Sequence, residues 1–97
     1  MRGSERQIKW AEDIKAQALD TIRSMRETRK HYDDLDGKPN SNLYDITYEA
    51  IDAIEAELML GFDRIEDASV IIDNRDRLTA DAIRNQARKW MRYNVRG

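Results

Sequence analysis

The chain has 97 residues and a net charge of −2, with 40% apolar and 37% charged residues. It contains no cysteine, which excludes disulfides, thiolate chemistry and zinc sites built on sulfur. No apolar run approaches the roughly 18 residues of a membrane span, and no signal-peptide pattern follows the start. The sequence therefore predicts a single soluble domain over residues 1–97, in the cytoplasm.

Charge is distributed unevenly along the chain. Residues 1–32 carry 8 basic and 5 acidic side chains, residues 33–76 carry 3 and 13, and residues 77–97 carry 6 and 1. Two interpretations are open. Either the basic ends lie against the acidic middle and reduce its self-repulsion, or the acidic middle is a surface that engages a basic partner.

Residues 3–32 show the periodicity of one long helix of roughly 28 residues. Ser4 is a good N-cap, and Gln7 completes a capping-box pattern. Apolar side chains recur at spacings of three and four and form a stripe, with Trp10 and Leu19 at its edges. The stripe consists of Ile8, Ala11, Ile14, Ala18, Ile22 and Met25. Cations gather in the last turns, where the helix dipole favours them; they are Arg23, Arg26, Arg29, Lys30 and His31.

Residues 33–42 predict a loop, because they contain Gly37, the single proline and several turn-forming side chains. Ser41 or Asn42 is the expected cap of a second helix over residues 43–60, which Gly61 ends or bends. Its predicted inner face is Leu43, Thr47, Ile51, Ile54 and Leu58, and its outer acidic row is Asp45, Glu49 and Asp52.

Residues 62–76 include three consecutive β-branched side chains, residues 70–72, but no second strand-like run exists to pair with them. A short helix is therefore expected. Thr79 then caps a last helix over residues 80–94, with an inner stripe of Ala80, Ile83, Ala87, Trp90 and Met91 and a basic row of Arg84, Arg88 and Arg92. The predicted fold is an all-α bundle of about four helices with a long first helix.

The sequence contains no recognisable motif for catalysis or for cofactor binding. His31 is the single histidine and has no evident serine partner, and the four glycines are far apart, so no phosphate loop is formed. The acids before Gly37 do not make a calcium loop, since Tyr32 and Leu43 stand where oxygen ligands are needed. We expect no enzyme activity, no metal and no cofactor.

Two blocks carry a resemblance to known proteins. "GSERQIKWAEDI" (3–14) and "ASVIIDNRD" (68–76) together resemble small proteins of phages and mobile elements, which share a G-S/T-x-K/R-Q-x-x-W/Y-A opening and an Ile-Asp-Asn-Arg block. This chain departs from them at Val70 and Ile71, where those proteins have aromatic residues. The resemblance implies a phage or mobile-element origin and a bacterial host cytoplasm. It also implies that Ile71 and Ile72 pack on Trp10 and Ile14.

The leading hypothesis is a non-enzymatic protein that inhibits a host nucleic-acid-handling defence complex, of anti-CRISPR type. A carboxylate-rich face competes for a basic channel that normally holds nucleic acid, because both present closely spaced negative charge. The partner is then a host protein or nucleoprotein complex. The expected partner-binding residues are Asp45, Glu49 and Asp52, with Glu55 and Glu57 secondary.

The alternative hypothesis is a small DNA- or RNA-binding regulatory or packaging protein that uses the basic last helix. Arg and Lys neutralise phosphates, and neighbouring polar side chains read base edges. The expected nucleic-acid-binding residues are Arg84, Arg88, Lys89 and Arg92.

The apolar stripe edges predict an assembly surface. Trp10, Leu19, Tyr44, Tyr48 and Phe62 all fall at such edges or on irregular segments. Contiguous exposed apolar area usually marks an interface. We expect either a homodimer through the first helix or a flat apolar docking surface for the target, with the dimer preferred.

Overall fold

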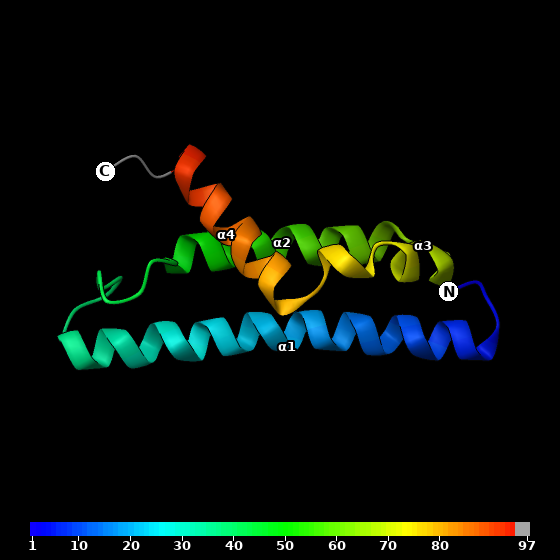
Figure 1. The fold of residues 1–97 in the computed structure, drawn as a ribbon, viewed down its shortest axis with the longest axis horizontal. Coiled ribbons are helices and arrows are strands. Elements are labelled where there is room, and N and C mark those ends of the chain that lie inside the picture. Colours follow the sequence, from blue (N-terminus) through cyan, green and yellow to red (C-terminus); the bar gives the residue numbers. More distant parts are fainter. Residues whose placement is uncertain (95–97) are drawn as a thin grey trace.

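The computed structural model describes residues 1–94, which form four α-helices and one 3₁₀ turn. The elements are α1 (Glu5–Asp36), α2 (Tyr48–Arg64), α3 (Ala68–Asp73), the 3₁₀ turn η1 (Arg75–Arg77) and α4 (Ala80–Asn94). Figure 1 shows α2 running antiparallel to α1, α3 lying near the N-terminal end, and α4 crossing α2 and projecting from the body. The predicted all-α bundle with a long first helix is confirmed.

Helix α1 sets the length of the molecule, whose longest dimension is 49 Å. Its N-terminus has the predicted capping box: Gln7 N–H donates to Ser4 Oγ (3.2 Å), and Ser4 N–H donates to Gln7 Oε1 (3.0 Å). The helix ends at Asp36, one turn beyond the predicted end at residue 32. Gly37 adopts φ 73°, and its N–H donates to the Asp33 carbonyl, which closes the last turn.

The predicted start of the second helix was wrong. Thr47 caps α2 by accepting from Ala50 N–H (3.3 Å), whereas Ser41 and Asn42 belong to the preceding loop. Leu43, predicted to face inward, is 57% exposed, and Ile46 is the loop residue that enters the core. The helix also continues through Gly61 to Arg64, because a glycine without a C-cap conformation does not interrupt helical hydrogen bonds.

Residues 62–76 do not form one short helix. Phe62 belongs to the last turn of α2 and is buried, so its placement at an exposed edge was wrong. An extended connection at Ile65 leads to α3, and Asn74 separates α3 from η1. The N-terminal residues are tied to this connection, since Arg2 N–H donates to the Glu66 carbonyl and Ala68 N–H donates to the Arg2 carbonyl (2.6 and 2.8 Å).

The core consists of two hydrophobic clusters arranged along α1. The larger one joins the C-terminal part of α1 to α2 and α4, and its buried members are Ala18, Ile22, Met25, Ile46, Ala50, Ile51, Ile54, Leu58, Phe62, Ile83 and Ala87. The smaller one joins the N-terminal part of α1 to α3, and its buried members are Ala11, Ile14, Ala68, Ile71 and Ile72. Leu78 packs against both clusters.

The expected packing of α3 on α1 is correct for Ile14 but not for Trp10. Ile71 and Ile72 are buried in the same cluster as Ile14. Trp10 is 48% exposed, and its ring instead faces the Arg75 guanidinium, 5.4 Å from the ring centroid. This geometry is a cation–π contact, which places Arg75 at the end of the Ile-Asp-Asn-Arg block over α1.

None of the helices within residues 1–94 contains an apolar stretch long enough to cross a lipid bilayer.

Candidate functional site

Arg29 holds the loop that leads into the acidic part of the chain. Its side chain is fully buried, and Nη1 donates to the carbonyls of Tyr44 and Ile46 (2.9 Å each). Nη2 donates to the Ser41 carbonyl (2.7 Å), and Nε donates to Asp33 Oδ1 (3.0 Å). The loop between α1 and α2 is therefore held by one guanidinium group, which replaces the helical hydrogen bonds predicted for residues 43–46.

Asp33 completes this network from the other side. Its carboxylate accepts from the N–H groups of Asn40 (3.1 Å) and Ser41 (2.9 Å) as well as from Arg29. Burial by itself raises the pKa of Asp33, but the hydrogen bonds from Ser41 N–H, the Arg29 guanidinium and Asn40 N–H together hold it below its usual value. The carboxylate is thus ionised and fully engaged, and its role is structural.

Sequence reasoning missed Arg29, which it placed with the cations of the last turns. A signal for it was present. Arg29 follows Ile22 and Met25 at helical spacing, so it falls on the buried stripe. A charged side chain on a buried stripe requires a set of hydrogen-bond partners, and the adjacent loop carbonyls supply them.

Two of the predicted partner-binding acids converge on Arg26 of α1. Its Nη2 contacts Asp52 Oδ1 at 2.6 Å and Glu55 Oε1 at 2.9 Å, while its Nη1 is buried without a hydrogen-bond partner among the described residues. One positive charge is therefore shared by two carboxylates. The pairing fixes both carboxylates in position and leaves this part of α2 with a net negative charge.

Asp45 does not lie on α2 with the other acids, because α2 begins three residues later. Its Oδ2 accepts from Arg88 Nε of α4 at 2.6 Å, and this hydrogen bond raises the pKa of Arg88. The contact joins one expected acidic residue to one expected nucleic-acid-binding residue. Together with the Arg26 pairs, it supports the interpretation that basic helices lie against the acidic middle of the chain.

The basic residues of α4 fall into two groups, those that form ion pairs within residues 1–94 and those that do not. Arg84 pairs with Asp81 (3.6 Å), one turn earlier, and Arg88 is held by Asp45. Lys89 and Arg92 are exposed and make no ion pair with residues 1–94. Of the four expected nucleic-acid-binding residues, only Lys89 and Arg92 therefore carry a positive charge that no carboxylate of residues 1–94 neutralises.

Glu57 differs from the other expected acids, because it forms no ion pair within the described part of the chain. It is exposed and lines two adjacent cavities, one of about 340 Å³ between α2, α3, η1 and α4 and one of about 270 Å³ between α2 and α4. Gln86 of α4 lines both of them as well. Glu49, at the start of α2, accepts a hydrogen bond from the Asn40 amide (3.2 Å) and is otherwise exposed.

Residues 1–94 offer no candidate metal site. No three histidine or carboxylate side chains there are arranged to hold a metal ion. His31 is exposed on α1, and its ring meets Tyr32 edge to face at 5.4 Å between centroids.

In comparisons with known proteins, no family model, no curated protein and no solved structure matches the chain.

Proposed function

We propose that this protein is a non-enzymatic interaction protein of phage or mobile-element origin. It binds a basic surface of a host nucleic-acid-handling defence complex, in the manner of an anti-CRISPR protein, and thereby inhibits it. The binding surface is the acidic surface, by which we mean the carboxylates of Asp45, Glu49, Asp52, Glu55 and Glu57. It extends over both flanks of α2, because Asp52 and Glu55 lie on the side of α1 and Glu57 lies on the side of α4. The observation that carries this proposal is the sharing of Arg26 between Asp52 and Glu55, which leaves α2 negative and its carboxylates positioned.

The chemistry of such binding is electrostatic. Basic channels that hold nucleic acid are lined by Lys and Arg at the spacing of phosphates, and a row of fixed carboxylates competes for the same cations. Glu49 and Glu57 lie two turns apart on α2 and are free of ion pairs within residues 1–94. These two carboxylates of the acidic surface can therefore bind a cation of the partner without first breaking an ion pair inside the protein.

The test is a plaque assay in bacterial strains that each carry one active DNA- or RNA-targeting defence system. Expression of the protein should restore phage plating in at least one strain. The Glu49→Lys/Glu57→Lys variant should lose that restoration at least tenfold, whereas the matched control Asp13→Lys/Glu27→Lys should retain it. Asp13 and Glu27 are also exposed and unpaired among the described residues, but they lie on α1. Restoration that survives the α2 variant, with helicity unchanged by circular dichroism, contradicts the proposal.

A second candidate function is nucleic-acid binding through the end of α4, and the exposure of Tyr93 favours it. Tyr93 is 69% exposed and lies near the end of α4, close in sequence to Lys89 and Arg92, which form no ion pair within residues 1–94. Figure 1 shows that this helix projects from the body of the molecule. Exposed aromatic rings between cations are stacking platforms for unpaired bases. A mobility shift with single-stranded DNA or RNA at low salt, lost in Lys89→Ala/Arg92→Ala, is the expected outcome. The absence of any shift at low salt contradicts this second function.

A further inference from the structure

The cavity of about 270 Å³ between α2 and the C-terminal half of α4 is lined by two aromatic side chains. Trp90 and Tyr93, three positions apart, both line it from α4, and Ile54 of α2 adds an apolar surface. Tyr93 is 69% exposed, so an incoming ring has access to it. The remaining lining residues are polar: Glu57, Gln86, Lys89 and Asn94. Aromatic side chains with polar groups beside them are typical of sites that hold an unpaired nucleic-acid base.

The polar groups of this cavity include both donors and acceptors. Glu57 is its one carboxylate and Lys89 is its one cation, and neither forms an ion pair within residues 1–94. The side-chain amides of Gln86 and Asn94 each donate one N–H to a backbone carbonyl (3.0 and 2.9 Å). Each amide keeps its oxygen and a second N–H for a ligand. The open groups therefore suit an occupant that donates to Glu57 and places an anionic group on Lys89.

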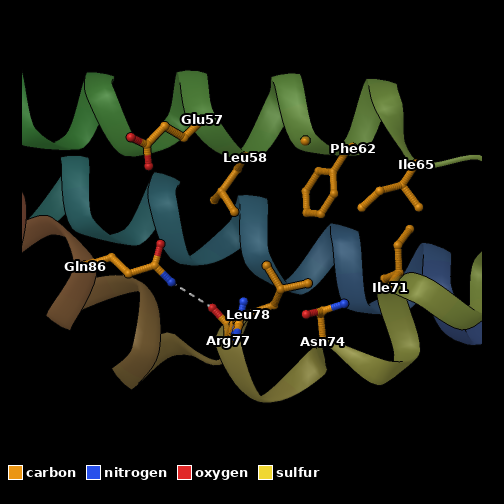
Figure 2. A pocket seen from close by; sticks show the side chains of 10 residues that line it. Glu57, Leu58, Phe62, Ile65, Ile71, Asn74, Arg77, Leu78 and Gln86 are labelled. Carbon is orange, nitrogen blue, oxygen red and sulfur yellow. Dashed lines mark hydrogen bonds between the residues drawn. The ribbon is translucent and has the colours of Figure 1, made fainter.

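The neighbouring cavity, of about 340 Å³, adds a second cation. Glu57 and Gln86 line both cavities, and Figure 2 shows these two side chains at one end of the larger one. Arg77 also lines the larger cavity, and its guanidinium forms no ion pair within residues 1–94. The two linings together therefore carry one carboxylate and two cations. Because the acids bound to Arg26 lie on the opposite flank of α2, an anionic ligand on the α4 side meets a lining of net positive charge.

We infer that the cavity lined by Trp90 and Tyr93 binds an unpaired guanine of a single-stranded nucleic acid. Guanine presents two adjacent donors on its Watson–Crick edge, the ring N1–H and the exocyclic amine, and the Glu57 carboxylate accepts from both. The other bases place an acceptor beside a single donor group on that edge, and the carboxylate repels this acceptor. The base stacks on Tyr93, and the flanking phosphates lie over Lys89 and Arg92, which are both exposed on α4. The inference rests on the second candidate function, since it names the base that the end of α4 reads.

The test titrates the isotopically labelled protein with short single strands of thymine nucleotides that differ only in their central base. The central base is guanine, adenine, thymine or hypoxanthine, which keeps N1–H but lacks the exocyclic amine. The titration is done at low salt, where contacts to phosphate are strongest. The guanine strand should bind about tenfold more tightly than the hypoxanthine strand, as expected for one charge-assisted hydrogen bond. The adenine strand should bind no more tightly than the thymine strand.

The two tryptophans supply an internal control for the position of the site. The guanine strand should shift the indole N–H signal of Trp90 and leave that of Trp10 unchanged, because Trp10 lies on α1 against Arg75. Equal affinities for the guanine and hypoxanthine strands overturn the inference. An unshifted Trp90 signal, or equal shifts of both indole signals, overturns it as well.

The matched variants for the carboxylate are Glu57→Gln and Asp63→Asn. Both residues are exposed on α2, but Asp63 does not line this cavity. Glu57→Gln should reduce the preference for guanine over hypoxanthine to less than about twofold, because a neutral amide accepts more weakly than a carboxylate. Asp63→Asn should leave the preference intact. A preference that survives in Glu57→Gln overturns the inference, because the exocyclic amine would then be read elsewhere.

The matched variants for the ring are Tyr93→Ala and Tyr93→Phe. Tyr93→Ala should weaken the binding of every strand about tenfold through the loss of stacking, and Tyr93→Phe should not. Undiminished affinity in Tyr93→Ala overturns the inference, because the base would then lie elsewhere. Guanosine monophosphate should bind more weakly than the guanine strand, since it lacks the flanking phosphates. Equal affinity for the two would make the free nucleotide the ligand and would overturn the assignment to a strand.

The strand titration and the mobility shift separate this inference from the second candidate function. If the strands shift in the gel and Lys89→Ala/Arg92→Ala abolishes the shift, but every base binds equally, the guanine site is wrong and nucleic-acid binding stands. If no strand binds at low salt, both are wrong. The plaque assay tests the inhibitory function whichever of these results is found.

Discussion

The guanidinium of Arg29 and the carboxylate of Asp33 lie one helical turn apart and together close the loop that follows α1. Arg29 donates to three carbonyls of this loop, and Asp33 accepts from two of its N–H groups. Each of the two side chains also satisfies the other, with Arg29 Nε 3.0 Å from Asp33 Oδ1. Because Arg29 is fully buried and the Asp33 side chain is only 11% exposed, removing either member leaves the other without compensation.

Arg29→Met should lower the free energy of unfolding by about 3–5 kcal/mol, as expected when a buried charge pair loses one partner. Arg29→Lys should also destabilise the protein, because an ammonium group does not reproduce the planar set of donors that reaches three carbonyls and a carboxylate. Urea denaturation followed by circular dichroism measures both. Arg23→Met is the control, since Arg23 is exposed and its one ion pair within residues 1–94 is with Asp20; it should cost less than about 1 kcal/mol. Equal stability of Arg29→Met and the wild type would contradict the role given to Arg29.

Acid should unfold the protein partly through Asp33. The folded-state pKa of Asp33 lies below its unfolded value, so its contribution to stability is fully present above about pH 4. That contribution is lost as the pH falls through the lower, folded-state pKa. Asp33→Asn should therefore be less stable than the wild type at pH 6, and the difference in urea midpoint should shrink toward pH 2.5. Parallel curves for the two proteins at all pH values would show that Asp33 is not responsible.

Two glycine substitutions should have opposite effects. Gly37 has φ 73°, and a Cβ there would meet no atom within 4 Å, so the cost of Gly37→Ala is that of the left-handed backbone alone, about 1 kcal/mol. Gly61 lies inside α2 with equally open space. Gly61→Ala should stabilise the protein by up to about 1 kcal/mol, because alanine favours the helix. Thermal unfolding of the two variants measures whether each midpoint falls or rises relative to the wild type. Destabilisation by Gly61→Ala would be inconsistent with an α2 that continues through residue 61.

The homodimer through the first helix stays a prediction, and the structure suggests where to test it. Leu19 and Ala16 of α1 and Met59 of α2 line a shallow cavity formed by these two helices, and Met59 is 46% exposed. Met59→Glu should convert a dimer to a monomer without lowering the thermal midpoint. Light scattering over a concentration series gives the mass. A monomer mass for the wild type at tens of micromolar rules out a stable dimer.

Leu19→Glu is a weaker probe of the same surface, because Leu19 is partly buried against the larger core cluster. If it lowers the thermal midpoint, Leu19 is part of the core, and the edge assigned to it from the sequence was wrong.

Local signals in the sequence predicted most of the helices. The capping box at Ser4 and the cap at Thr79 depend on residues three positions apart, and both are present, with Ala82 N–H donating to Thr79 Oγ1 at 3.2 Å. The start of α2 could not be predicted in the same way. Residues 43–46 have helical spacing, but Arg29, from the preceding helix, binds the carbonyls of Tyr44 and Ile46 and holds the chain in a loop.

The sequence names the acids of residues 45–57 as a set but does not predict how they are arranged. Their pairing depends on partners that lie far away in the sequence. Arg26 lies 29 positions from Glu55, and Arg88 lies 43 positions from Asp45. Periodicity within one helix carries no information about such contacts, so it could not single out Glu57 as an acid with an adjacent cavity.

The division of the core into two clusters along α1 has a consequence for hydrogen exchange. Arg29 and the loop it holds are at most 17 positions apart in sequence, so this end of the molecule closes over short loops. Ile14 and Ile71, in the smaller cluster, are brought together only by closing a loop of more than fifty residues, and α3 has just six residues to hold the contact. Parts of a protein can unfold separately as cooperative units, and the unit held by fewer contacts opens at a lower free energy. Here that unit is the smaller cluster. Amide hydrogens of α3 and the first turns of α1 should therefore exchange through a partial opening that leaves α2, α4 and the rest of α1 protected.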